Sequence, residues 1–60
     1  MSQAIQEVYN LGFVAGSNWR SEKVDKNTRR SAAAILDSNP NLNAELNEAW
    51  NRGYNAGFDG

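Results

Sequence analysis

EVYNLGFVAG, residues 7–16, returns almost unchanged as EAWNRGYNAG, residues 48–57. Aligned by their first residues, the two copies share a glutamate, an asparagine, an alanine and both glycines, and each has aromatic rings at the same two positions. An internal repeat of this kind indicates that one structural unit occurs twice in the fold.

Both copies have the spacing of an amphipathic helix, because apolar residues and glycines recur at intervals of three and four. The first helix is predicted over residues 3–20. The last is predicted over residues 40–58, where Asn39 offers a cap and Pro40 suits the first helical turn.

The segment between the copies predicts a shorter helix over residues 27–38, which has to end before Pro40 because a residue preceding proline avoids the helical conformation. Residues 21–26 are read either as a turn or as one further helical turn. No stretch alternates β-branched and polar residues as a strand would. The sequence therefore predicts a single all-α domain over residues 1–60, a helical hairpin or three-helix bundle that forms an oligomer.

Glycines lie in the middle of both apolar stripes, where each costs about 1 kcal/mol of helix stability relative to alanine. Small residues four apart allow a second helix backbone to approach closely. We therefore expect a helix-packing and oligomer interface, formed either within one chain or between chains. The alternative is a ligand slot. The residues of this surface are Tyr9, Gly12, Phe13, Gly16, Trp19, Trp50, Gly53, Tyr54 and Gly57.

The composition excludes several classes of function. A chain of 60 residues buries little surface, and without cysteine or histidine it has neither disulfides nor the usual zinc ligands. We therefore expect the chain to gain stability by self-association. Glu7 and Glu48 repeat, but no nucleophile or metal cage accompanies them, so we predict a non-enzyme without a cofactor. No apolar run long enough for a membrane span and no signal pattern is present, which predicts a cytoplasmic protein without a membrane partner.

The charges are distributed unevenly. Residues 20–30 contain five cations and two acids, Glu22 and Asp25, a balance of +3, whereas the other residues contain one cation and five acids, a balance of −4. Such a basic segment can contact phosphate or an acidic protein surface, or it can simply pair with acids of the neighbouring helices. We predict that it is the partner-binding surface. Its cations are Arg20, Lys23, Lys26, Arg29 and Arg30.

The segment RGYNAGFDG, residues 52–60, resembles the ribosome modulation factor family of bacteria and their phages, whose members carry a similar Arg-Gly-Tyr-x-Ala-Gly-x-x-Gly phrase on a helix. The resemblance implies a small helical protein that docks on ribosomal RNA and suppresses translation. That family is strongly basic, whereas this chain has a net charge of −1, so RNA docking ranks second here.

The leading expectation is a small non-enzymatic regulator or inhibitor that docks on a larger protein partner. Phage-encoded modulators of host machinery or host defence are often built on this scale, which is an analogy and not a deduction from the residues. Two other classes stay open. One is RNA docking, and the other is capture of a small nucleotide between subunits by Arg20, Arg52 and the aromatic residues.

Overall fold

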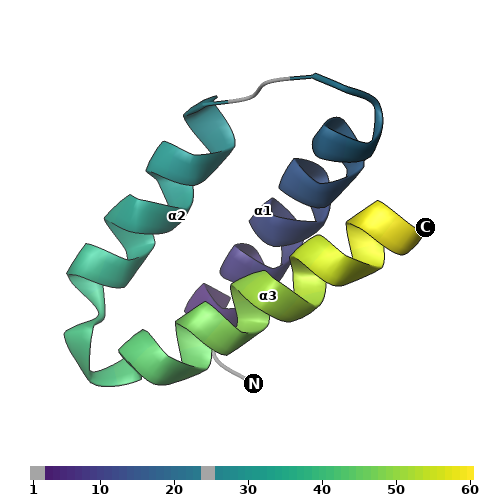
Figure 1. Ribbon diagram of the computed structural model, residues 1–60. Helices are drawn as coiled ribbons and strands as arrows, with labels where there is room; N and C mark the ends of the chain where they lie inside the picture. Colours follow the sequence, from purple (N-terminus) through teal and green to yellow (C-terminus); the bar gives the residue numbers. More distant parts are fainter. Residues whose placement is uncertain (1–2, 24–25) are drawn as a thin grey trace.

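The computed structural model describes residues 3–23 and 26–60, in which three α-helices and one short 3₁₀ helix follow one another. They are α1 (Gln3–Arg20), α2 (Lys26–Ser38), η1 (Pro40–Leu42) and α3 (Asn43–Asp59). No strand occurs in these residues, and the predicted all-α fold is confirmed. α1 and α3 lie side by side, and α2 lies to one side of that pair (Figure 1).

The core lies where all three helices converge. Val8 of α1 and Leu46 of α3 are completely enclosed, and Ala49 completes the buried cluster. The partly buried side chains packed around it are Ala4, Ile5, Tyr9, Ile35, Leu36, Leu42 and Trp50. Because Ile35, Leu36 and Leu42 come from the end of α2 and from η1, the core is concentrated near the α2–α3 connection.

The repeat explains how α1 and α3 pack. α2 carries the chain back, so the two copies run in the same direction (Figure 1). A β-carbon built on Gly12 would lie 2.5 Å from the Trp50 carbonyl oxygen, and one built on Gly53 would collide with the Tyr9 carbonyl oxygen. Gly12 and Gly53 are equivalent in the repeat, as are Tyr9 and Trp50, so the contact is reciprocal.

The second glycine of each copy repeats this relation one helical turn later. Gly16 faces the Tyr54 carbonyl oxygen, and Gly57 faces the Phe13 carbonyl oxygen, again with no room for a β-carbon. Reciprocal contacts between equivalent residues are the signature of a two-fold interface. α1 and α3 therefore pack as two subunits of a symmetric dimer would, but within one chain.

This arrangement changes the expected oligomer interface. All four helical glycines are buried between α1 and α3 of the same chain, so a second copy would have to use other surfaces. The physical reason is that the two copies are covalently joined. Their high effective concentration favours packing of α1 on α3 within one chain over packing against a second molecule.

The start of the last helix differs from the prediction. Residues 40–42 form a 3₁₀ turn before α3 begins at Asn43. The Asn39 side chain, expected to cap this helix, makes no such bond. Its Nδ2 instead donates a hydrogen bond to the Ile35 carbonyl oxygen at 2.9 Å. That carbonyl belongs to the last turn of α2, which has no intrahelical partner for its oxygens, so Asn39 closes the preceding helix.

α1 ends in a tight hydrogen-bonded turn. The Lys23 amide donates to the Asn18 carbonyl at 2.7 Å, and the Glu22 amide donates to the Trp19 carbonyl at 3.0 Å. This pair of bonds defines a Schellman ending, in which the residue at the position of Glu22 adopts a left-handed conformation. Glu22 accordingly has a φ of 60°. α2 then begins at Lys26, one residue before the predicted start.

A basic-aromatic groove

A groove of about 580 Å³ opens between α1, α3 and the first turns of α2. Among the described residues, three cations and three aromatic rings line it, and none of these lining residues is acidic. We call it the basic-aromatic groove, and its defining residues are Trp19, Lys23, Lys26, Arg29, Trp50 and Tyr54. A positively charged space with ring-covered walls is suited to binding an anion that also carries apolar or planar groups.

Each cation reaches the groove for a local reason. Lys26 and Arg29 are three residues apart on α2 and therefore share a face. Thr28 and Ala32, which are buried, hold α2 against the rest of the protein. Lys23 follows the left-handed residue Glu22, so the turn that ends α1 determines where it lies.

Two of the rings come from the second copy of the repeat, and the third comes from the end of α1. Trp50 and Tyr54 are one helical turn apart on α3 and are half-buried beside the glycine contact. Trp19 comes from the last turn of α1 and is 61% exposed, the largest exposure among the big hydrophobic side chains. The Tyr54 ring also stacks on Phe58, with centroids 6.5 Å apart and planes 12° from parallel.

Within the described part of the chain, the groove cations form no ion pair with an acidic side chain. The salt bridge that does form joins Arg52 Nη2 and Glu48 Oε1 at 2.6 Å, on the exposed surface of α3. Three cations around one space, with no carboxylate among its described lining residues, favour anionic ligands there. The basic segment contains two acids, Glu22 and Asp25, and Asp25 lies outside the described residues.

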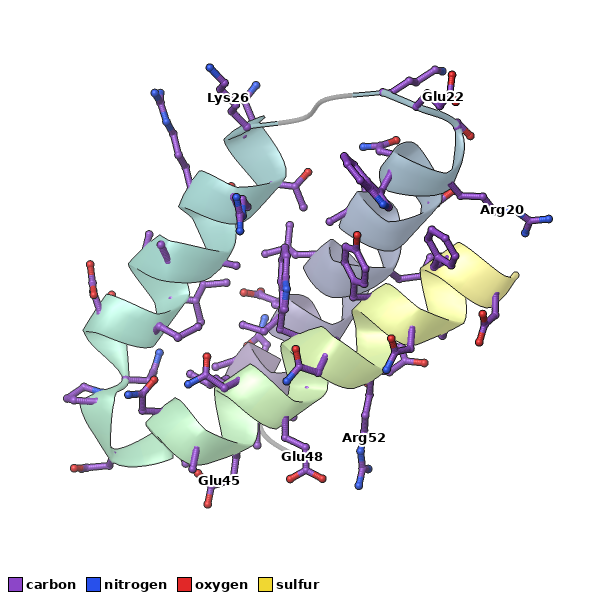
Figure 2. All side chains as sticks on the ribbon, viewed as in Figure 1. Arg20, Glu22, Lys26, Glu45, Glu48 and Arg52 are labelled. Carbon is purple, nitrogen blue, oxygen red and sulfur yellow. The ribbon has the colours of Figure 1, made fainter. Side chains whose placement is uncertain are left out.

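Two cations of the predicted surface do not line the groove. Arg20 points away from α2, whereas Lys26 lies at the start of α2 (Figure 2). Arg30 follows Arg29 directly and is therefore turned by about 100° around the helix. The structure thus brings together Lys23, Lys26 and Arg29, and it leaves Arg20 and Arg30 outside the lining.

The arginines expected to hold a nucleotide are also placed differently. Arg52 lies beside Glu48, and both point outward from α3 (Figure 2). Neither Arg20 nor Arg52 lines the basic-aromatic groove. Arg52 instead lines a separate pocket together with Tyr9. The expected nucleotide site between subunits stays a prediction.

The predicted packing surface divides into buried and exposed parts. Gly12, Gly16, Gly53 and Gly57 are buried, and Tyr9 is half-buried beside the core. Phe13 and Trp19 are exposed instead. Phe58 was missed by the sequence analysis, although its position one turn after Tyr54 was a usable signal for a shared face.

A metal-binding cluster and a membrane-spanning helix are both absent from the described residues. They contain no cluster of three or more acidic, histidine or cysteine side chains able to hold a metal ion. Glu48 is occupied by its bond to Arg52. Among the same residues, no helix combines the length and the apolar character that crossing a membrane requires.

Comparisons with protein families, curated proteins and solved structures find no match to this chain.

Proposed function

We propose that this chain is a small non-enzymatic regulator or inhibitor that docks through the basic-aromatic groove on an acidic surface of a larger protein partner. The observation that supports this role is the meeting of Lys23, Lys26 and Arg29 around the exposed ring of Trp19. Tryptophan, tyrosine and arginine are the residues that most often dominate binding energy at protein interfaces.

The charge distribution supports an oriented encounter. The basic segment has a balance of +3 and the remaining residues a balance of −4, so the two regions of the chain differ in sign. An acidic partner is attracted to the groove and repelled by the rest of the surface, which raises the association rate and fixes the orientation. The exposed rings then supply apolar contact that charge alone does not provide.

We place this role in the cytoplasm, in the setting of a phage protein that acts on host machinery or host defence. A chain of 60 residues that presents the basic-aromatic groove can block a larger protein by contact alone.

The docking proposal is tested by charge reversal. The variant Lys23→Glu/Lys26→Glu/Arg29→Glu is expected to lose the partner recovered by affinity purification from the native host, while its helicity by circular dichroism stays unchanged. Arg20→Glu/Arg30→Glu is the matched control, because both cations belong to the same segment but lie outside the groove. It is expected to retain most of the binding, since charges outside the contact contribute mainly through long-range attraction. Full binding by the triple variant would move the docking site elsewhere.

RNA docking is a second candidate, because rings beside cations also suit single-stranded RNA. Each neutralised phosphate of a single strand contributes about −0.7 to the slope of log affinity against log salt, so three groove cations predict a slope of about −2. The acidic remainder of the chain opposes a long polyanion, and we expect only weak binding to ribosomal subunits at physiological salt. Tight binding with a steeper slope would rank RNA ahead of protein docking.

A further inference from the structure

We infer that the basic-aromatic groove is also a binding site for a small ligand, a nucleotide whose base stacks on the groove rings and whose phosphates contact Lys23, Lys26 and Arg29. This site goes beyond the proposed docking role and does not depend on it. It also differs from the site expected from the sequence, since it lies within one chain and uses neither Arg20 nor Arg52.

The rings provide the surface for the base. Trp19, Trp50 and Tyr54 all line the same space, so a planar ring placed there meets aromatic side chains from both α1 and α3. Stacking of a nucleobase on aromatic side chains is a general mode of recognition, because every base has a flat π-face. The large exposed fraction of Trp19, 61%, leaves its ring available for such a contact.

The cations provide the site for the phosphates. Lys23 lies in the turn after α1, whereas Lys26 and Arg29 lie on α2, so the positive charges come from two segments of the chain. None of the described lining residues is acidic, and no described carboxylate occupies these cations. Arginine and lysine bind phosphate oxygens through charge-assisted hydrogen bonds.

The size of the groove favours a nucleotide over a polymer. Its volume of about 580 Å³ falls in the range of small-molecule sites, about 300–1,000 Å³. The Asn51 side chain also lines the groove and is exposed, so it offers both donors and an acceptor to the edge of a base. A long nucleic acid would have to continue beyond the groove across a surface whose residues sum to −4.

The chain carries its own reporter for this site. It has two tryptophans, Trp19 and Trp50, and both line the groove. Intrinsic tryptophan fluorescence therefore responds to occupancy of the groove, and calorimetry on the same samples gives affinity and stoichiometry independently.

The test titrates the purified protein with ADP, GDP, UDP and CDP, and separately with adenosine and with inorganic phosphate. At least one nucleoside diphosphate is expected to bind at one site per chain and about tenfold more tightly than adenosine or phosphate alone, because ring and phosphate contacts add. Failure of all four nucleotides, or equal binding of phosphate alone, would overturn the proposal.

Two variants assign the two parts of the ligand. Lys26→Glu/Arg29→Glu is expected to weaken nucleotide binding by about tenfold or more, whereas the control Arg20→Glu/Arg30→Glu changes it by about twofold or less. Trp19→Ala, at an exposed position, is expected to reduce nucleotide affinity toward that of inorganic phosphate, measured by calorimetry. Equal losses in the control, or no loss in Trp19→Ala, would contradict the assignment.

The same samples distinguish nucleotide binding from RNA binding and from protein docking. A single-stranded RNA oligonucleotide that binds far more tightly than any mononucleotide would show that the groove serves a nucleic acid, and the nucleotide proposal would be wrong. Loss of partner docking in the charge-reversed variant together with an absence of nucleotide binding in the wild type would support docking alone. Nucleotide binding without partner docking would support this inference alone.

Discussion

At the residue scale, Glu22 adopts a backbone conformation that its side chain disfavours. Its φ of 60° is required by the turn that ends α1, and the β-carbon of an L-residue in this region costs about 1–2 kcal/mol. Glycine avoids most of that cost. Glu22→Gly is therefore expected to raise the free energy of unfolding by about 1 kcal/mol, measured by urea denaturation.

Glu22→Gln is the matched control, because it removes the same charge but keeps the β-carbon. Its stability is expected to stay within about 0.5 kcal/mol of the wild type, as for most exposed substitutions. Equal stabilisation by glycine and glutamine would show that the charge of Glu22, and not its backbone conformation, limits stability.

At the scale of the helices, the reciprocal glycine contact predicts that equivalent substitutions in α1 and α3 destabilise the protein in the same way. Gly16→Ala and Gly57→Ala each place a β-carbon against a backbone carbonyl oxygen of the other helix, which cannot move without separating α1 from α3. Overpacking of this kind costs about 1–3 kcal/mol. Because the obstructing atoms are backbone, the cost should lie in the upper part of that range, above the gain of about 1 kcal/mol in helix propensity. Both variants are expected to unfold at lower urea concentrations than the wild type.

Ser17→Ala controls for helix propensity, since Ser17 neighbours Gly16 but is exposed. It is expected to be neutral or slightly stabilising. If Gly16→Ala proved more stable than the wild type, α1 and α3 would not be in close contact at this turn. A large loss at Gly16 with none at Gly57 would contradict the two-fold relation between the copies.

The helices also show which features a sequence can predict. The periodicity predicts a helix over residues 3–20, and α1 runs Gln3–Arg20, because spacing along one helix is a local property. The role of Asn39 was predicted wrongly, since two helix ends compete for one side chain and the sequence does not rank them. The basic segment was recognised from its charge, but the separation of Arg29 from Arg30 depends on how α2 is rotated.

The groove itself could not be predicted, because it depends on how the elements are placed in space. Its rings come from α1 and α3. Its cations come from the turn that follows α1 and from α2. The apolar stripe of α2 is thin, and its buried residues are Thr28 and Ala32. From the sequence, such a stripe does not determine the distance between the start of α2 and α3. The identity of the lining residues therefore emerges only with the three-dimensional arrangement.

At the scale of the whole molecule, the central question is what stabilises so small a core. Val8 and Leu46 are the largest fully buried side chains among the described residues, and the glycine stripes contribute close contact with little apolar area. A domain of about 60 residues buries a smaller fraction of its surface than a larger one. We therefore still expect self-association, but through side chains that the α1–α3 contact leaves exposed.

Phe13 and Val14 are the best candidates on α1, being 43% and 44% exposed although apolar, and neither lines the groove. We expect light scattering at micromolar concentration to give a multiple of the 6.6 kDa chain mass, and the melting temperature to rise with concentration, as linkage requires. Phe13→Gln/Val14→Gln should shift the mass toward a monomer that melts lower. Trp19→Gln, in the groove, should leave the mass unchanged. A wild-type monomer with a cooperative, concentration-independent melt would show that the two joined copies of the repeat suffice to fold this chain alone.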